Sequence, residues 1–429
     1  MARQRTCPIG ELIHPDGETR FLEYKSTLRW DVQLGQKADH IEDAVVKTIA
    51  GFASRPLKWF AMLAIPFIFL SISMFAGGIV SVISGDAGSG LPLTGSGLFF
   101  ASLSVFLVFS GGLISDAAAA FSKVAIYLAS AVAIPLGQPW FERRGVKNFE
   151  FPVLVLLAAL GMGMMASSGD LISLYVGVEL HSLALYVLAA MHRDNAKASE
   201  AGLKYFVLGA LSSGLLLYGA SLIYGFAGST LFPDIAVAAA GGANTGLLFG
   251  LVFLICGLAF KVSAAPFHMW TPDVYEGAPT PVVAFFAAAP KLAAMVLFAR
   301  VLAEGFAGAV DQWQQVLVLI ALISVAVGAF AGLVQKNLKR LWAYSSIANI
   351  GYALLGLSSG TSEGVQAMLV FMILYMIDVT GFFACLVALN REGKPMETMD
   401  DVAGLIREKP ALGLAMTVFA FSALGLPPL

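Results

Sequence analysis

The chain has 429 residues, of which 58% are hydrophobic and only 13% are charged, and its mean hydropathy is +0.81. This composition excludes an ordinary soluble domain and indicates a membrane protein with several spans. The formal net charge of −2 gives no reason to expect nucleic acid as a partner.

The three cysteines, Cys7, Cys256 and Cys385, lie far apart in the sequence. Because no CxxC motif or Cys/His cluster is present to hold zinc or an iron–sulfur cluster, we expect no metal or redox centre. A glycine-rich dinucleotide fingerprint and a nucleophile elbow are absent from the sequence as well. If the chain belongs to a redox complex, we expect it not to be the part that handles electrons.

Residues 1–56 are polar and mixed in charge, and the segment EDAVVKTIAGFAS within them has the spacing of an amphipathic helix. They lack the pattern of a secretory signal peptide. The stretch FLEYKSTLRWD, from Phe21 to Asp31, resembles the opening of AlbA-type DNA-binding domains of bacterial regulators, but the glycine-rich strand that follows in such domains is missing. We expect a soluble segment that is either a genuine fusion or foreign to the membrane domain at 57–429.

Apolar runs of about 20 residues recur from Trp59 onwards, and each is long enough to cross a bilayer as a helix. We expect spans at about 59–83, 92–113, 116–137, 149–168, 171–191, 202–226, 246–266, 280–303, 313–334, 340–358, 364–389 and 411–429. The last run stops at the sequence GLPPL without a polar flank, so we expect the chain to end within or just after a helix.

The charges in the loops alternate in sign along the chain. The basic loops contain Arg143, Arg144, Lys147, Arg193, Lys197, Lys336, Lys339, Arg340, Arg391, Lys394, Arg407 and Lys409, and the loops between them contain Asp170, Asp234, Asp311 and Glu363. The basic loops are therefore expected to face the cytoplasm. The stretch from His268 to Pro279 falls on that side but has no Lys or Arg, which indicates a segment that dips back into the protein. Counting the spans backwards from these loops places residue 58 on the outer side of the membrane, unless one of the first two apolar runs does not cross the membrane.

The stretch from Cys256 to Lys291 contains two lysines within apolar helical sequence, Lys261 and Lys291, separated by a polar turn rich in proline. We expect the first of these helices to break near Pro266. Ionisable groups inside a membrane usually mark an ion or proton path. Irregular backbone at that depth is tolerated only where protein or a water-filled cavity covers it.

Glu179 lies in the middle of an apolar run, where a carboxylate either pairs with a cation or is protonated. Lys261 and Lys204 are the expected partners. The alternatives are a position at the membrane interface for Glu179 and side chains that reach the cytoplasmic interface for the two lysines. Lys291, with about eleven residues on each side before polar sequence, is the deepest lysine. A buried lysine balanced between desolvation and a nearby carboxylate can exchange a proton at neutral pH, as a relay requires.

Two further polar residues have two readings each, and one basic cluster has a single expected role. His268, in the broken segment, is either a structural hydrogen-bonding group or a proton carrier. Asp378 is a buried acid without an assigned partner, and its role is either structural or functional. Lys336, Lys339 and Arg340 open a helix at the cytoplasmic edge, where solvated anchors are expected.

Several motifs together resemble the antiporter-like chain N family of respiratory complex I, the bacterial counterpart of mitochondrial subunit two. They are VELHSL, EAGLKYFVLGALSSGLLLYG, GLAFKVSAAPFHMWTPDVYEGAPTPV, QKNLKRLWAYSSIANIGYALLG and GLPPL. The resemblance covers roughly Gly111 to Leu429, and the run FKVSAAPFHMWTPDVYEGAPTPV is highly specific to the antiporter-like chains. Residues 59–110 match only as apolar helices, and residues 1–56 do not match.

The resemblance implies an all-α polytopic membrane fold of fourteen helices, about twelve of them present here, with two inverted five-helix repeats that each contain a broken helix. The first break would lie near Pro266 and the second at the GLPPL sequence. The implied site consists of Glu179 as the acid of the fifth helix, Lys204 and Lys261 as the lysines of the sixth and seventh, and Lys291 as the central lysine of the eighth. The family carries a further lysine shortly after the LPP sequence, and this sequence stops before it.

The implied function is that of a proton-translocating membrane subunit of NADH:quinone oxidoreductase in the bacterial inner membrane. Its partners would be other membrane subunits of complex I, the lipid bilayer and protons. No cofactor is expected in this chain, because NADH, FMN, iron–sulfur clusters and quinone are used by other subunits. Two alternatives stay open: a subunit of a multi-subunit sodium/proton antiporter, which shares this ancestry, and a membrane-anchored regulator that uses residues 1–56.

Overall fold

The computed structural model describes residues 30–31, 36–37, 111–146, 149–241, 244–391 and 394–425. The chain divides into two units, Met1–Leu70 and Ser71–Leu429. In the first unit the described backbone consists of two short antiparallel strands, β1 (Trp30–Asp31) and β2 (Gln36–Lys37). The rest of the segment expected at 1–56, including the AlbA-type resemblance, and nearly all of the first two expected spans lie outside the described residues.

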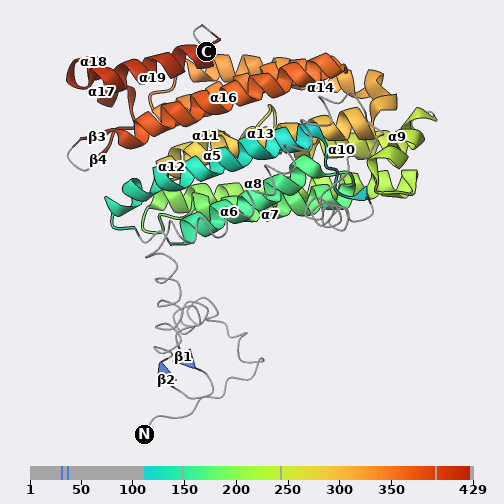
Figure 1. Ribbon diagram of the computed structural model, residues 1–429, viewed down its shortest axis with the longest axis horizontal. Helices are drawn as coiled ribbons and strands as arrows, with labels where there is room; N and C mark the ends of the chain where they lie inside the picture. The colour runs from blue at the N-terminus through green and yellow to red at the C-terminus, as the bar shows by residue number, and fades with distance from the viewer. Residues whose placement is uncertain are drawn as a thin grey trace, which may run out of the picture. The chain divides into compact units, whose positions relative to one another are not determined.

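The second unit is a bundle of long apolar helices (Figure 1). Its helices are α5 (Ala117–Glu142), α6 (Glu150–Ser167), α7 (Leu171–Ala189), α8 (Ala196–Ala227), α9 (Phe232–Ala240), α10 (Thr245–Val262), α11 (Thr271–Gly277), α12 (Thr280–Ala287), α13 (Ala289–Arg300), α14 (Val310–Gly332), α15 (Leu338–Ser358), α16 (Ser362–Ala388), α17 (Met399–Val402), α18 (Leu405–Glu408) and α19 (Pro410–Ala423). A π-helical turn, Val301–Gly305, continues α13, and a short 3-10 turn, Ala307–Ala309, precedes α14. Strands β3 (Asn390–Arg391) and β4 (Lys394–Pro395) form a hairpin after α16.

The expected all-helical membrane fold is confirmed. Among the described residues, eight helical segments are long and apolar enough to cross a membrane. The other two expected runs that lie in this part of the chain form α15 and α19. Helix α15 is less apolar than the other long helices because it carries polar residues such as Ser346 and Asn349, both of which are buried. The short helix α9 was not expected.

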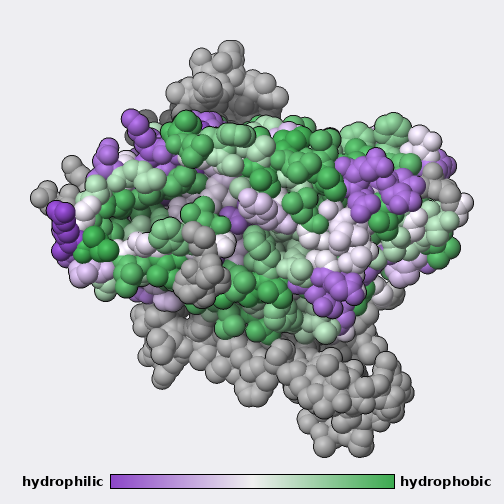
Figure 2. All heavy atoms as spheres, turned by 90° about the horizontal axis from the view of Figure 1, so that it is seen from above, coloured by the Kyte–Doolittle hydropathy of each residue, from purple (hydrophilic) through white to green (hydrophobic). Residues whose placement is uncertain are grey.

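The basic and acidic loops lie at opposite ends of the bundle. In Figure 1 the β3–β4 hairpin, which contains Arg391 and Lys394, lies at the left end, and α9, which contains Asp234, lies at the right end. Figure 2 shows a mainly hydrophobic surface on one side, with hydrophilic residues gathered towards the ends. Large apolar side chains such as Leu211 and Phe330 are exposed on this bundle. Such a broad apolar belt suits contact with lipid tails.

The break in the first lysine-bearing helix begins earlier than expected. Helix α10 ends at Val262 rather than at Pro266, because Ser263 adopts the left-handed conformation with φ of 68°. The backbone groups released there find partners: the Trp270 indole donates to the carbonyl of Phe260 at 3.0 Å, and the Ser324 hydroxyl accepts from the amide of Ala265 at 2.8 Å. This agrees with the expectation that irregular backbone at this depth is covered by protein.

The helix that carries Lys291 is itself broken, which the sequence analysis did not expect. The chain leaves helical geometry at Ala288, where φ is −100° and ψ is −97°, and α13 starts at the next residue. Within Thr280–Gly305, every residue of the most apolar stretch is buried. Helices α5, α6, α10 and α16 pack around it, and Figure 1 shows α12 and α13 in the middle of the bundle. Lys291 therefore lies on a helix that is enclosed by the protein.

The pairing of α8 with α10 depends on close approach of two backbones. A Cβ atom on Gly219 would lie 2.7 Å from the carbonyl oxygen of Gly250 and 2.7 Å from the amide nitrogen of Leu254. Real Cβ atoms do not approach backbone atoms so closely, so a side chain at this position forces the two helices apart. Gly214, on the same helix, has nothing within 4 Å of the corresponding position.

We expect Gly219→Ala to destabilise the bundle, because a single added methyl group overpacks the α8–α10 contact at a cost of about 1–3 kcal/mol. The midpoint of thermal unfolding of the detergent-solubilised protein should fall by several degrees. Gly214→Ala is the matched control and should leave the midpoint unchanged or raise it slightly, since alanine favours helix. Equal midpoints for the two variants would contradict the close approach.

Candidate functional site

Lys261 lies in the last turn of α10, where three helices meet, and its side chain is 7% exposed. Its ammonium group donates to the hydroxyl of Ser182 at 2.9 Å, to that of Tyr186 at 3.4 Å and to that of Ser213 at 3.4 Å. Ser182 and Tyr186 belong to α7 and Ser213 to α8. Hydroxyl groups can both accept and donate protons. Lys261 is thus held in a cage of groups that can exchange protons with it.

Glu179 lies one helical turn before Ser182 on α7, on the side that faces Lys261. Its carboxylate acts electrostatically on the Lys261 ammonium, but no ion pair of 4.0 Å or less joins the two. One carboxylate oxygen, Oε1, is buried without a hydrogen-bond partner among the described residues. Glu179 and Lys261 therefore interact without direct contact. The hydroxyl of Ser182, rather than the carboxylate, binds the lysine.

His181 belongs to the same cluster, and the sequence analysis did not assign it a role. Its ring nitrogen Nδ1 lies 3.3 Å from the Ser182 hydroxyl and 3.3 Å from the carbonyl of Val178. Its other ring nitrogen, Nε2, is buried without a partner in the described part of the chain. The only sequence signal was its position two residues after Glu179 within an apolar run.

Lys291 lies in the first turn of α13, just after the break at Ala288, and is 1% exposed. Its ammonium group donates a hydrogen bond to the hydroxyl of Ser346 on α15. The Tyr375 hydroxyl of α16 donates to the same oxygen at 2.6 Å. The ammonium group also lies 5.7 Å from the ring centre of Tyr275 on α11. As at Lys261, the direct partners of this amine in the described structure are hydroxyl and aromatic groups.

A row of aromatic rings starts at the Lys261 cage. The ring of Tyr186, which binds Lys261, meets the ring of Tyr205 edge-on at 4.8 Å, and Tyr205 stacks on Trp270 at 4.3 Å. The hydroxyl of Tyr275, beside Lys291, is buried without a hydrogen-bond partner among the described residues. The broken segment between α10 and α12 therefore supplies Trp270 to the row of rings that starts at Lys261, and Tyr275 to the surroundings of Lys291.

Lys204 is not brought to Glu179. Its side chain is 42% exposed and forms ion pairs with Glu200 at 2.8 Å and with Asp273 of α11 at 2.9 Å. The structure thus places Lys204 at the end of the bundle, in agreement with the alternative that its side chain reaches the interface.

An ionic network surrounds α11. Arg340 lies 2.6 Å from Asp273 and 3.2 Å from Glu276, and Lys197 lies 3.1 Å from Glu276. The stretch from His268 to Pro279 has no basic residue of its own, but the neighbouring helices α8 and α15 supply cations to its acids. Lys197 and Arg340 belong to the loops that are expected to face the cytoplasm. The absence of Lys and Arg from the stretch is therefore compatible with a position on the cytoplasmic side.

The pKa values of the two acids on α11 report this pairing. Burial acts to raise the pKa of Asp273, but hydrogen bonds from Lys204 and Arg340 outweigh burial and hold the pKa below its ordinary value. The pKa of Glu276 is lowered in the same way. Burial acts to raise it, but hydrogen bonds from Lys197 and Arg340 outweigh burial. Both side chains are therefore ionised at neutral pH.

His268 lies apart from the two lysine cages. Its side chain is half-buried at the start of the turn before α11, and its Nδ1 atom is buried without a hydrogen-bond partner among the described residues.

A buried ion cluster at the other end of α13 was missed by the sequence analysis. Arg300 is 4% exposed, and its guanidinium donates to Asp116 at 2.6 Å, to Glu304 at 2.6 Å and to the carbonyl of Ala166 at 2.7 Å. It therefore fastens the end of α13 to α5 and α6. The available signal was an Arg and a Glu four residues apart at the end of an apolar run.

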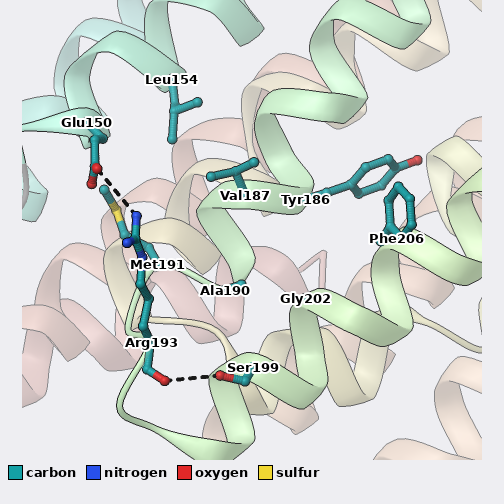
Figure 3. Close-up of a pocket in the computed structure, with 10 residues that line it drawn as sticks. All are labelled: Glu150, Leu154, Tyr186, Val187, Ala190, Met191, Arg193, Ser199, Gly202 and Phe206. Atoms are coloured by element: carbon teal, nitrogen blue, oxygen red, sulfur yellow. Dashed lines mark hydrogen bonds and ion pairs between the residues drawn. The ribbon is translucent and has the colours of Figure 1, made fainter. Parts of the chain in front are cut away.

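A groove of about 380 Å³ opens between α6, α7 and α8 next to the Lys261 cage. Figure 3 shows the ion pair of Arg193 and Glu150 at one side of this groove and the rings of Tyr186 and Phe206 at the other. The two charged groups of the rim are 3.4 Å apart. Because the hydroxyl of Tyr186 binds Lys261, the groove reaches from a polar rim to a direct partner of the buried amine.

Broken helices and buried lysines held by hydroxyl groups are features of ion-translocating membrane proteins. The chain belongs to the NADH:quinone oxidoreductase/Mrp antiporter membrane family, whose sequence profile matches residues 168–429.

Similar proteins carry a common name. NADH-quinone oxidoreductase subunit N of Caulobacter sp. (strain K31) is 72% identical over 293 residues, which cover 67% of this chain and 61% of that protein. The subunit N of Parvibaculum lavamentivorans is 50% identical over 376 residues, covering 85% of this chain and 78% of the relative. A chain in the structure of respiratory complex I from Thermus thermophilus with bound aureothin superposes with a TM-score of 0.63 at 36% identity, over 84% of this chain and 78% of that chain. This chain therefore spans about three fifths of the length of the Caulobacter relative.

We expect the ionic network around α11 to be lost in acid. Because the folded-state pKa of Asp273 is lowered, the network stabilises the fold above the ordinary pKa of about 4, and this stabilisation decreases as the pH falls towards the lower folded-state value. The thermal midpoint of the solubilised protein should therefore decrease less steeply with acidification in Asp273→Asn than in wild type. Asp194→Asn, at an exposed position between α7 and α8, should keep the wild-type slope. Parallel slopes for wild type and Asp273→Asn would contradict the assignment.

Proposed function

We propose that this chain is a proton-translocating membrane subunit of NADH:quinone oxidoreductase. The observation that carries the proposal is Lys291: a fully enclosed amine on a broken helix, bound to a hydroxyl group that a second hydroxyl group also contacts. The names of the similar proteins support the same function. The chain itself would change no covalent bond. NADH, FMN, iron–sulfur clusters and quinone would be used by other subunits, and other membrane subunits of the complex would be its partners.

The proposed coupling begins at Glu179 and Lys261. Two unit charges 4 Å apart attract by about 4 kcal/mol at an effective dielectric constant of 20, and doubling the distance halves this energy. A charge rearrangement at the quinone end of the complex that changes the Glu179–Lys261 interaction would change how strongly Lys261 holds its proton. Because hydroxyl groups, rather than a closely paired carboxylate, bind the amine, we propose that such a shift releases the proton.

The released proton would pass from Lys261 to Lys291. Tyr205 and Trp270 would line the way from the Lys261 side, and Tyr275 lies beside Lys291 with a hydroxyl that has no hydrogen-bond partner among the described residues. Lys204 would hold α11 in place through its ion pair with Asp273. His268, in the turn that precedes α11, would be a further proton carrier. In this proposal Lys204 positions the broken segment, whereas Lys261 and Lys291 carry protons.

We expect Lys291→Met to abolish NADH-driven proton pumping in the assembled complex, because methionine has a similar volume but cannot carry a proton. The measurement is dye-reported acidification in inverted membrane vesicles, together with the rate of NADH oxidation. Lys336→Met is the matched control, since Lys336 is exposed between α14 and α15, and it should pump at the wild-type rate. Unchanged pumping in Lys291→Met would exclude the proposed role.

We expect Glu179→Gln to slow pumping without abolishing it. Loss of about 1–2 kcal/mol of attraction to Lys261 corresponds to a five- to thirtyfold change in rate. The initial rate of acidification after addition of NADH should fall within this range. A rate equal to that of wild type would show that the carboxylate does not control Lys261.

A second candidate, a subunit of a multi-subunit sodium/proton antiporter, is favoured by the description of the family, which includes Mrp antiporters. The two candidates differ in the phenotype of a deletion strain. Loss of NADH-driven quinone reduction supports the complex I subunit, whereas sodium-dependent growth with intact quinone reduction supports the antiporter.

A further inference from the structure

Asp378 is a buried acid that the path described so far does not use. It lies on α16, is 4% exposed, and accepts a hydrogen bond from the Ser422 hydroxyl of α19 at 2.8 Å through Oδ2. Its other oxygen, Oδ1, is buried without a hydrogen-bond partner among the described residues. In the same part of the chain, no Lys, Arg or His lies within ion-pair distance of it. A carboxyl group in such a position is stable when it holds a proton.

Two hydroxyl groups lead from Lys291 to the turn of α16 that precedes Asp378. Tyr375 lies one helical turn before Asp378 on α16, and no hydrogen bond joins these two described side chains. That hydroxyl donates to Ser346, whose oxygen also accepts from Lys291. A hydrogen-bonded row of polar groups therefore leads from α13 through α15 to Tyr375 on α16, one helical turn before Asp378 and its unpartnered oxygen.

Helix α15 provides a second polar contact in the same direction. Asn349, one turn after Ser346, donates to the carbonyl of Ser345 at 2.9 Å and to that of Ala423, the last residue of α19, at 3.4 Å. Ser422, which binds Asp378, precedes Ala423. The polar row thus ends where α15, α16 and α19 meet.

We propose that Asp378 is a proton-carrying residue that receives protons from Lys291 through Ser346 and Tyr375 and passes them on at the end of α19. This inference rests on the proposed function. In each transfer the Lys291 ammonium loses one proton and becomes neutral, and the Asp378 carboxylate gains one and becomes a carboxylic acid. Ser346 and Tyr375 each accept one proton and donate another, so both end unchanged after their hydroxyl groups rotate. The total charge is the same before and after the transfer.

The test uses the assembled complex in inverted membrane vesicles. Asp378→Asn keeps the size of the side chain and an oxygen for Ser422 but cannot release a proton, and we expect it to lower NADH-driven acidification at least about tenfold. Asp378→Glu should restore at least about half of the wild-type rate. Thr380→Val is the matched control on α16, because it removes a hydroxyl that binds only its own helix at Met376, and it should pump normally.

Infrared difference spectroscopy of the NADH-driven complex provides a second measurement, which does not require an Asp378 variant to assemble. We expect a carboxylic acid carbonyl band in the wild-type spectrum that is absent from Lys291→Met, since protons then no longer arrive at Asp378. A purely structural acid would show no such band.

The inference is overturned if Asp378→Asn pumps at the wild-type rate, if Asp378→Glu pumps no better than Asp378→Asn in an assembled complex, or if wild type shows no carbonyl band. In these cases loss of pumping in Lys291→Met leaves the proposed function intact. Normal pumping in Lys291→Met removes the proposed function as well, so the two failures are distinguishable.

Discussion

Two buried amines, Lys261 and Lys291, are hydrogen-bonded to hydroxyl groups rather than closely paired with carboxylates, and the rest of the structure serves this arrangement. Removing a charge from water costs several kcal/mol even after the protein relaxes. A tight ion pair would offset this cost but would also fix the proton on the amine. Hydroxyl groups stabilise the ammonium group less and can also interact with the neutral amine, so neither form is excluded. The arrangement favours exchange of a proton over permanent storage of a charge.

The strong ion pairs are found instead at the two ends of the central helix. At the start of α12, the hydroxyl of Thr280 donates to Glu397 at 3.2 Å, and Glu397 pairs with Lys339 at 3.0 Å. At the end of α13, Arg300 binds acids of α5 and of the π-helical turn. The broken helix is therefore anchored at both ends, and Lys291 lies between the anchors.

The burial of Lys261 and Lys291 was predictable from the sequence, because both lysines lie within long apolar runs. The position of Lys204 was not predictable, since a long side chain near a helix end can extend either into the bundle or towards the interface. Its partner Asp273 lies 69 residues away in the sequence. Arg300 was missed for a similar reason: its partner Asp116 is 184 residues distant. Sequence patterns report local periodicity, whereas these contacts depend on which helices become neighbours.

The course of the backbone was predicted in outline but not in detail. Pro266 suggested the break after α10, yet the helix ends at Val262 because Ser263 takes a left-handed conformation. The break at Ala288 had only Pro290 as a signal, and proline near the start of a helix is also common without a break. Hydroxyl partners such as Ser346 look unremarkable in the sequence, because a serine in an apolar helix usually bonds to its own backbone.

The enclosed position of α12 and α13 has a consequence for the surroundings of the protein. A helix without contact to fatty-acyl chains is shielded from changes in their length, saturation or order, which act on the exposed faces of helices such as α8 and α14. The polar environment of Lys291 therefore stays constant when a bacterium remodels its phospholipids during growth at another temperature. Adaptation of the outer helices to a thicker or thinner bilayer leaves the chemistry of the interior unchanged.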